Sequence, residues 1–193
     1  DDGLDHEHPD IEDHYSSAYS YDWCNDDSDP TPQSNNGHGT SAGGVAAAVG
    51  DNGIDVTGAG YGATLAGSTL IAFGTSDQME ADALIFQMEN IDIYTNSWGP
   101  ADDGQTLESP GPITLAAFEN AAYNGRSGLG NIYTWAAGNG LESDDNANYD
   151  GYANSRFTIA VTAITHTGEQ SYYAEPGANI LLAAHSNGDG EGI

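Results

Sequence analysis

The sequence predicts an α/β fold with a mainly parallel central sheet, because strand-like and helix-like segments alternate along it. From His38 onward, apolar runs typical of strands alternate with segments whose apolar residues have helical spacing. Such alternation is typical of parallel strands joined by right-handed helical crossovers. The chain has 193 residues, enough for one sizeable core, and no low-complexity or linker-like stretch divides it. We therefore expect a single domain over residues 1–193.

The first predicted elements follow His38. A run of small residues predicts a helix over residues 41–49, and an apolar run predicts a buried strand over residues 63–73. Thr75 or Ser76 is expected to cap a helix over the following "DQMEADALIFQMEN" stretch, because both side chains can accept hydrogen bonds from the first helical turn.

The second half continues the alternation. Residues 91–99 are expected to form a strand and residues 112–125 a helix that stops at glycine. Three further strands are predicted, over residues 131–140, 157–165 and 178–184. Ligands in such sheets bind beyond the carboxyl ends of the strands. The polar loops "NSWGPADDG" and "AAGNGLESDDNANYDG" stand at such ends and are the expected place of a site.

The charge of the chain is strongly one-sided. Thirty acidic residues oppose two basic ones, giving a formal net charge of −28, which excludes nucleic acid as a partner bound through phosphates. A salt-adapted surface, bound cations and a cleft for basic ligands could each contribute, and a solvated acidic surface accounts for most of the charge. The single cysteine, Cys24, is expected to be a small buried hydrophobe rather than a reactive thiol. No apolar run is long enough to span a membrane, and membrane association of a longer protein stays open.

One histidine stands in an unusual context. His38 lies between glycines in "SNNGHGTSAGG". A histidine that acts as a general base needs a carboxylate to hold its tautomer and a nucleophile to deprotonate. Asp1 in "DDG" could supply the carboxylate, and "GNG" at residues 138–140 could supply an amide donor for an oxyanion. Each signal is weak when taken singly.

Together and in this order, the motifs carry a family resemblance. The runs "DDGLDHEHPD", "HGTSAGG", "DIYTNSWGPADDG", "GRSGLGNIYTWAAGNG" and "NYDGYANSRFTIAV" resemble the subtilisin-like serine proteases (subtilases, peptidase family S8). Within that family, "SWGPADDG" and "DGYANS" are similar to the kexin/furin branch of proprotein convertases. The resemblance covers essentially the whole chain. It implies a three-layer subtilisin-like fold, with a mainly parallel central sheet flanked by helices and incomplete at both ends.

Carried over residue by residue, the resemblance implies the catalytic groups. Asp1 would be the triad aspartate, His38 the general base and Asn139 the oxyanion-hole side chain. The family's nucleophile lies in a Gly-Thr-Ser-Ala motif downstream of a region like "SNGDGEGI". The match at residues 39–42 belongs to the histidine motif, so Ser41 is not expected to be the nucleophile. We expect a partial catalytic domain that starts at the triad aspartate and ends before the serine.

The resemblance also implies a cleft for basic substrates, since a desolvated cation needs directed carboxylate acceptors. Asp102 and Asp150 would receive a basic P1 side chain, and Asp2 would face P2. Glu80 and Glu108 would lie toward a P4 arginine. The substrate-binding residues further include Ser97, Trp98 and Gly99 of the "SWG" segment. The loop before His38 is shorter than in furin, which weakens the expectation of strict P2 selectivity.

Calcium is the implied cofactor, with two expected sites and a third that is possible. Calcium takes several oxygen ligands, including carboxylates and backbone carbonyls. The first site would use Asp10 and Asn52 with the carbonyls of Val49, Ile54 and Val56. The second would use Asp102, Asp145 and Glu175, and the third Asp22, Asp27 and Asp29. For the third, an ordinary acidic surface loop remains the alternative.

Other features bear on identity and context. Ala147 and Gly177 occupy positions where furin has disulfide-bonded cysteines. The resemblance implies protein or peptide substrates with basic residues, a propeptide, a downstream β-rich domain and a secreted or cell-surface location. The lack of lysine favours a salt-adapted organism. Two rival functions stay open: a broad-specificity extracellular subtilase, and a non-catalytic calcium-binding pseudoprotease.

Overall fold

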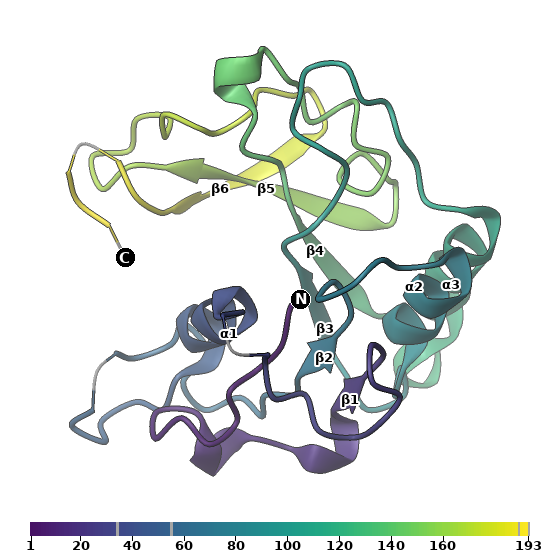
Figure 1. Ribbon diagram of the computed structural model, residues 1–193, viewed down its shortest axis with the longest axis vertical. Coiled ribbons are helices and arrows are strands. Elements are labelled where there is room, and N and C mark those ends of the chain that lie inside the picture. Colours follow the sequence, from purple (N-terminus) through teal and green to yellow (C-terminus); the bar gives the residue numbers. More distant parts are fainter. Residues whose placement is uncertain (34, 55, 189, 193) are drawn as a thin grey trace. The chain divides into compact units, whose positions relative to one another are not determined.

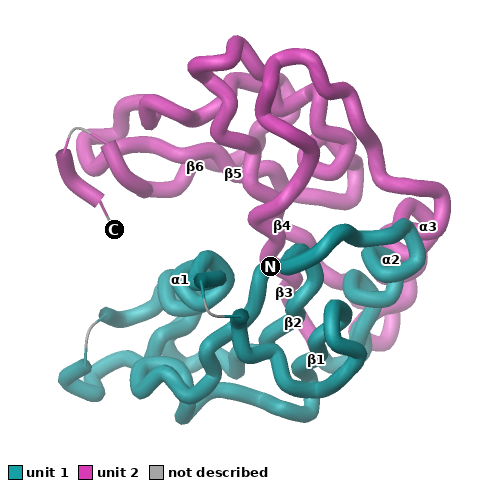
Figure 2. Tube along the Cα trace, viewed as in Figure 1, with its two compact units in different colours: residues 1–90 teal, residues 91–193 magenta. Residues whose placement is uncertain are grey.

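The computed structural model describes residues 1–33, 35–54, 56–188 and 190–192. The chain divides into two compact units, residues 1–90 and 91–193 (Figure 2), and each is described by itself. No helix within the described ranges is long and apolar enough to cross a membrane.

Unit 1 is built from short elements around a small parallel pair of strands (Figure 1). Its elements are η1 (Glu12–His14), η2 (Ser17–Tyr19), β1 (Tyr21–Asp22), α1 (His38–Ala47), β2 (Ser68–Thr69) and α2 (Asp77–Ile85). In the parallel pair, Tyr21 is opposite Ser68 and Asp22 is opposite Thr69. Asp1 lies beside β2, because its nitrogen donates to the Ser68 carbonyl at 3.0 Å and its carbonyl accepts from the Leu70 nitrogen at 2.9 Å. The prediction of a strand over residues 63–73 is wrong in extent, because within that range β2 covers only Ser68–Thr69.

The two helices of unit 1 partly match the predictions. α1 begins at His38, three residues before the predicted start, and ends at Ala47. Ser76 caps α2, because its side chain accepts a hydrogen bond from the Met79 nitrogen at 3.3 Å. The prediction that this helix extends to residue 90 is wrong: α2 ends at Ile85, and Gln87 has a φ of +56°. Cys24 is half-buried rather than buried as predicted. Burial still raises the pKa of its thiol, which is typical of an unreactive cysteine.

Unit 2 contains the parallel sheet (Figure 1). Its elements are β3 (Ile93–Asn96), α3 (Pro112–Gly128), β4 (Ile132–Ala136), η3 (Leu141–Ser143), β5 (Thr158–Ile164) and β6 (Ile180–His185). The four strands lie in the order β3-β4-β5-β6, and every neighbouring pair is parallel. The predicted α/β class with a parallel sheet is confirmed. The expectation that the helix over residues 112–125 stops at glycine is also correct, since Gly125 leaves the helical conformation and Arg126 and Ser127 are left-handed.

Aromatic packing fixes the sheet of unit 2 to its loops. Phe118 of α3 contacts Tyr133 of β4 edge-on, with ring centroids 5.1 Å apart. The fully buried Trp135 of β4 stacks on Tyr152 at 5.2 Å and donates its indole N–H to the Trp98 carbonyl at 2.7 Å. Both loops are thus anchored to one buried indole, and they carry the predicted site residues Asp102, Asn139, Asp145 and Asp150.

Candidate active site and metal centre

In unit 1, Asp1 and His38 form a carboxylate–imidazole pair. Nδ1 of His38 lies 2.9 Å from Oδ1 and 3.0 Å from Oδ2 of Asp1. The Asp1 side chain is 14% exposed and that of His38 is 61% exposed. A carboxylate that accepts from Nδ1–H selects the tautomer in which Nε2 is the free base. The pair therefore presents a basic nitrogen to solvent, as a general base requires.

Close packing behind the imidazole explains the glycine that follows it. A β-carbon on Gly39 would collide with the Gly3 carbonyl and would lie 3.0 Å from the Asp1 β-carbon. The first residues of the chain consequently lie directly against the start of α1. Small residues after His38 allow the approach that brings Asp1 within hydrogen-bond distance.

Asp2 has a role that sequence reasoning missed. Its Oδ1 accepts from the Gly39 nitrogen at 2.7 Å, and its Oδ2 accepts from the His38 nitrogen at 3.3 Å. The helix lacks a cap from its own N-cap residue, Gly37. Asp2, predicted to face P2, thus caps α1 from a distant part of the sequence, where a carboxylate also interacts favourably with the helix dipole.

Asp10 lies at the centre of the first predicted calcium loop. It is 1% exposed, and its two oxygens accept from Nδ2 of Asn52 at 2.8 Å and from the Val56 nitrogen at 3.0 Å. The hydrogen bond from Asn52, followed by that from Val56, lowers the pKa of Asp10. Asn52 in turn accepts from the Ile54 nitrogen at 3.0 Å, while the Val49 nitrogen donates to the Asp10 carbonyl at 2.9 Å. The structure brings Asp10 and Asn52 together and ties the backbone nitrogens of Ile54 and Val56 to their side chains.

The three carboxylates of the possible third site serve turns instead. Asp22 is 2% exposed, and its oxygens accept from the Cys24 nitrogen and from both the backbone and the side chain of Asn25. Asp29 accepts from Thr31, and Asp27 accepts from the nitrogen of Asp29. Among the described residues, these three are not part of a converging set of metal ligands. The third calcium site stays a prediction without support from this geometry.

Unit 2 holds a converging acidic cluster, formed by Asp102, Asp145 and Glu175. One ligand atom from each lies within 4.8 Å of the others, and the last two side chains are buried. The pKa of Glu175 is raised from 4.5 to about 7, chiefly by burial and also by the nearby charges of Asp102 and Asp145. Repulsion among buried carboxylates is relieved by a cation, and an all-oxygen donor set suits a hard divalent ion. The residues therefore fit a metal such as calcium.

The "GNG" segment is built into the same cluster. A β-carbon on Gly138 would collide with Oε1 of Glu175, and Gly138 has a φ of +99°, a conformation that favours glycine. The Gly140 nitrogen donates to Oε1 of Glu175 at 2.9 Å. Asn139 itself is exposed, and its backbone nitrogen and Nδ2 both donate to Oδ2 of Asp102, at 2.9 and 3.3 Å. The acidic cluster thus orients the predicted oxyanion side chain.

Asp150 lies close to this cluster. Its Oδ1 accepts from the Tyr152 nitrogen at 2.6 Å and the Ala153 nitrogen at 3.2 Å. Its pKa is raised to about 6 despite these hydrogen bonds, chiefly by burial and also by the charges of Asp102 and Glu108. A cavity of about 10 Å³ is lined by both Asp102 and Asp150, together with Asp145 and Glu175. Four carboxylates along one small cavity, with no salt bridge to a basic residue in the described part of the chain, favour a cationic occupant.

The remaining predicted substrate residues differ in exposure. Glu108 is exposed and lies beside Asp150, because its backbone pairs with Tyr149 and Gly151. Glu80 is only 8% exposed, and its Oε1 accepts from Oγ1 of Thr75 at 2.6 Å. Glu80 therefore holds the start of α2 rather than presenting its carboxylate to solvent.

The "SWG" segment supports the wall of the acidic cavity. The Trp98 carbonyl is held by Trp135, and Ser97 is half-buried. A β-carbon on Gly99 would lie 2.7 Å from Oδ2 of Asp150. The positions of the family disulfide are also adjacent, since a β-carbon on Gly177 would lie 2.9 Å from that of Ala147.

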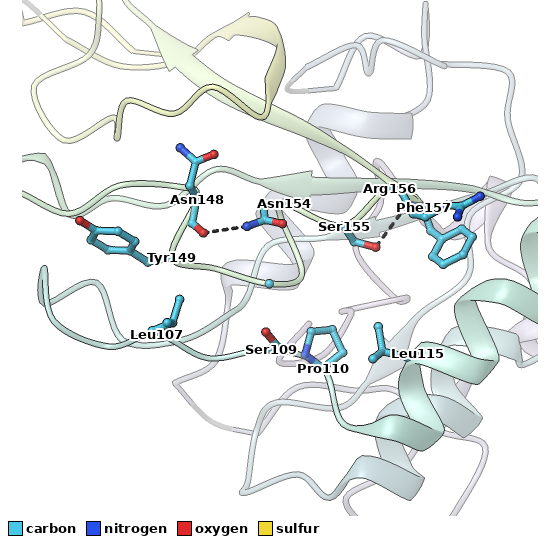
Figure 3. Close-up of a pocket in the computed structure, with 11 residues that line it drawn as sticks. Leu107, Ser109, Pro110, Leu115, Asn148, Tyr149, Asn154, Ser155, Arg156 and Phe157 are labelled. Carbon is cyan, nitrogen blue, oxygen red and sulfur yellow. Dashed lines mark hydrogen bonds between the residues drawn. The ribbon is translucent and has the colours of Figure 1, made fainter.

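A second depression lies in unit 2 and was not predicted (Figure 3). It has a volume of about 350 Å³, and its lining includes Leu107, Pro110, Leu115 and Phe157. Arg156, one of two basic residues, lies over the Phe157 ring at 5.1 Å. The apolar side chains come from separate segments, which is why no local motif marks the depression.

The comparisons with known proteins agree with this geometry. The family model described as Subtilase family (Peptidase_S8) matches residues 1–188. The chain belongs to the subtilase family. Furin-like protease 1 of Drosophila melanogaster is 40% identical to this subtilase over 192 residues, which cover 97% of the chain and 17% of that protein. A PC3-like endoprotease of Hydra vulgaris, variant B, is 42% identical over 196 residues, covering 97% of the chain and 28% of the relative. The chain thus spans less than a third of these relatives.

Solved structures show the same fold. The Aeromonas sobria serine protease, in complex with its chaperone, matches with a TM-score of 0.80 and 26% identity, covering 97% of this subtilase and 35% of that chain. A cold-adapted subtilisin-like serine proteinase matches with a TM-score of 0.70 at 18% identity, over 97% of this chain and 61% of its own. The predicted family and subtilisin-like fold class are confirmed.

Proposed function

We propose that the complete protein is a calcium-dependent serine endopeptidase of the kexin/furin-like branch. The observation that carries the proposal is the Asp1–His38 pair, which leaves Nε2 of His38 exposed as a base. A pseudoprotease under no selection for catalysis has no need of this tautomer-selecting contact. His38 would take the proton of a serine outside residues 1–193, and residues 1–193 would form one part of the catalytic domain.

Asn139 is proposed to stabilise the tetrahedral oxyanion. Its Nδ2 carries two hydrogens, of which one is directed at Asp102, and the other is available to an oxyanion. A preorganised donor of this kind contributes about 3 kcal/mol to transition-state stabilisation. The contact with Asp102 supports the orientation that the reaction needs.

The acidic cavity supports selectivity for a basic P1 residue. Asp102 and Asp150 line it, and the negative charge of Asp102 contributes to the raised pKa of Asp150, so an arginine or lysine side chain would relieve their repulsion. Calcium held by Asp102, Asp145 and Glu175 would supply the positive charge that keeps the cluster folded. A second ion held at Asp10 and Asn52 would order the loop after α1.

Selectivity at P2 and P4 is proposed to be weak. The carboxylate of Asp2 is engaged by the first amides of α1, and Glu80 is buried against Thr75. Both groups would have to leave existing hydrogen bonds to meet a substrate cation. This favours cleavage after single basic residues over a strict dibasic requirement. The proposed specificity is therefore broader than that of a strict dibasic convertase.

The resemblance to secreted proteases also bears on where the enzyme acts. We infer a secreted or cell-surface protease that cleaves proteins and peptides, made with a propeptide and a downstream β-rich domain. Its acidic surface of net charge −28 supports adaptation to high salt, where screening reduces self-repulsion.

Peptide assays on the full-length protein test the proposal. Peptides with Ala-Arg, Arg-Arg and Ala-Phe at P2-P1 are compared, with calcium and with a chelator. We expect both arginine peptides to be cleaved at similar rates, the phenylalanine peptide poorly, and chelation to abolish cleavage. Preference for phenylalanine would refute basic selectivity, and a large preference for Arg-Arg would refute weak P2 selection. No cleavage of any peptide by protein of native circular dichroism would favour the pseudoprotease.

A further inference from the structure

We propose that Asn139 is a deamidation site held inactive by the hydrogen bond from Gly140 to Glu175. Five Asn–Gly pairs occur in the sequence, beginning at Asn36, Asn52, Asn124, Asn139 and Asn187. One of them contains the proposed oxyanion residue. The modification itself does not depend on the proposed function, but its effect on catalysis does.

The chemistry requires a free backbone nitrogen after the asparagine. The Gly140 nitrogen would lose its proton and attack Cγ of Asn139, forming a new C–N bond and a five-membered succinimide. The side-chain nitrogen takes up a proton and leaves as ammonia. Water then opens the ring to aspartate or isoaspartate, and no oxidant or other reagent is needed. Glycine at the second position favours attack because it has no β-carbon to block the approach.

The packing of the acidic cluster leaves room only for glycine at position 140, and so requires the labile Asn139–Gly140 pair. A β-carbon on Gly140 would lie 2.6 Å from the β-carbon of Asp145 and 2.9 Å from Oε1 of Glu175. Any larger residue would therefore displace a ligand of the cluster. The glycine that makes Asn139 chemically vulnerable is the residue that the metal centre requires at this position.

The same cluster holds both reacting groups apart. Gly140 is buried, and its nitrogen donates to the buried Oε1 of Glu175 at 2.9 Å. A hydrogen bond to a carboxylate stabilises the protonated amide and opposes loss of its proton. Nδ2 of Asn139 is held by Asp102 at 3.3 Å, which fixes the side chain. Attack would require breaking the contact with Glu175 and turning the backbone between residues 139 and 140.

The pair at Asn36 provides the contrast. Gly37 is exposed, and across the described part of the chain neither its nitrogen nor the Asn36 side chain has a hydrogen-bond partner. Nothing comparable opposes attack there. Asn52 is intermediate, because its side chain is held by Asp10. We expect deamidation to begin at Asn36 and to spare Asn139.

Without the hydrogen bond to Glu175, deamidation would convert Asn139, a hydrogen-bond donor, into an aspartate. Aspartate at position 139 would lack the amide hydrogens and would place a further negative charge beside Asp102. If Asn139 serves the oxyanion, this change inactivates the enzyme irreversibly. A cation bound by the cluster would hold Glu175 in place, so loss of the metal would allow deamidation of Asn139.

Site-resolved mass spectrometry of the full-length protein tests the inference. Glu175→Ala removes the acceptor, Glu175→Gln keeps an oxygen that can accept from Gly140, and Glu142→Ala removes an exposed carboxylate of the same loop. After incubation at mildly alkaline pH with calcium, we expect Glu175→Ala to deamidate at Asn139 at least about tenfold faster than the wild type, as loss of one charged hydrogen bond predicts. Glu175→Gln, which keeps only an uncharged acceptor, should fall between the wild type and Glu175→Ala. Glu142→Ala should stay close to wild type, and the rates at Asn36 and Asn124 should not change.

Two results would overturn the inference. One is equal deamidation of Asn139 and Asn36 in the wild-type protein, and the other is an unchanged Asn139 rate in Glu175→Ala. If Glu175→Ala unfolds, the deamidation rate at Asn124, near the end of α3, will also increase. Amide hydrogen exchange of the wild-type protein then tests whether Gly140 is protected. The Gly140 amide should exchange far more slowly than that of Gly37 with calcium, and faster after chelation. Exchange of Gly140 as fast as Gly37 in the calcium-loaded protein would refute protection. Peptidase activity enters none of these measurements, so failure of the proposed function would leave them unaffected.

Discussion

Oδ2 of Asp150 lies 2.7 Å from the position that a β-carbon on Gly99 would occupy. The carboxylate that we assign to P1 recognition is therefore packed against the backbone of the "SWG" segment. Its other oxygen is fixed by the nitrogens of Tyr152 and Ala153, so the whole group has a defined position.

Gly99→Ala should disturb this position. We expect the new methyl group to displace the Asp150 carboxylate and to lower kcat/KM for a P1-arginine peptide by about 10- to 100-fold, the effect of a small misplacement. Steady-state kinetics of the full-length protein measure the change. Gly44→Ala is the control: nothing lies within 4 Å of its added β-carbon, and it should stabilise α1 by about 0.5–1 kcal/mol without changing selectivity. Unaltered kinetics in Gly99→Ala would contradict the role of Asp150.

Asp1→Asn should impair catalysis with little effect on binding. The amide cannot accept from Nδ1–H in the way the carboxylate does, so His38 would adopt the wrong tautomer. We expect kcat to fall by about 10⁴-fold while KM stays near the wild-type value. Asp13→Asn, which changes an exposed carboxylate near the same end of the chain, should leave both constants unchanged. A similar loss in the two variants would argue against a specific Asp1–His38 function.

Glu175 should give the metal-free protein a distinctive pH dependence. Its pKa is raised from 4.5 to about 7 in the folded state, so the folded protein holds this proton more tightly than the unfolded chain does. Its contribution is fully present below pH 4.5 and is lost as pH rises to about 7. In chelator, the Tm should therefore fall as pH rises through this window.

Calcium should oppose that dependence, because a bound cation favours the charged carboxylate. Thermal unfolding is followed between pH 4.5 and 7.5, with calcium and with chelator. Glu175→Gln should remove most of the difference between the two curves, whereas Glu142→Gln should not. Identical pH profiles with and without calcium in the wild type would count against a metal at this cluster.

Asp10→Asn should weaken the loop after α1. Asp10 accepts from Asn52 and Val56, and an asparagine would direct an amide group at one of these two donors. We expect a lower Tm and loss of the stabilisation by calcium that this loop provides. Asp51→Asn is a matched control, because Asp51 is exposed and has a φ of +61° that asparagine tolerates. Equal calcium stabilisation of both variants, measured by thermal unfolding, would place the ion elsewhere.

Some features could be predicted because local motifs determine them. The strands of unit 2 follow from apolar runs, and the end of the regular part of α3 follows from Gly125. Ser76 was predicted as a cap from its residue type and position. The acidic trio Asp102, Asp145 and Glu175 came from family resemblance, and the structure brings these distant residues together.

Other features depend on contacts between distant parts of the chain. The early end of α2 reflects the backbone at Phe86 and Gln87, which the apolar pattern did not reveal. Asp22 was assigned to a metal, yet it satisfies the amides of its own turn. A carboxylate in an acidic loop can take either role, and only its neighbours distinguish them.

The sequence by itself determined the α/β class, the subtilase family and the identity of the Asp1–His38 pair, because these reside in residue order and periodicity. The tertiary structure alone decided which carboxylates are free to meet a ligand. It engages Asp2 with the amides of α1 and buries Glu80, while it gathers Glu175 with Asp102 around the "GNG" segment. The physical reason is that a carboxylate must find hydrogen-bond donors or a cation when it is buried, and folding decides which of these it meets.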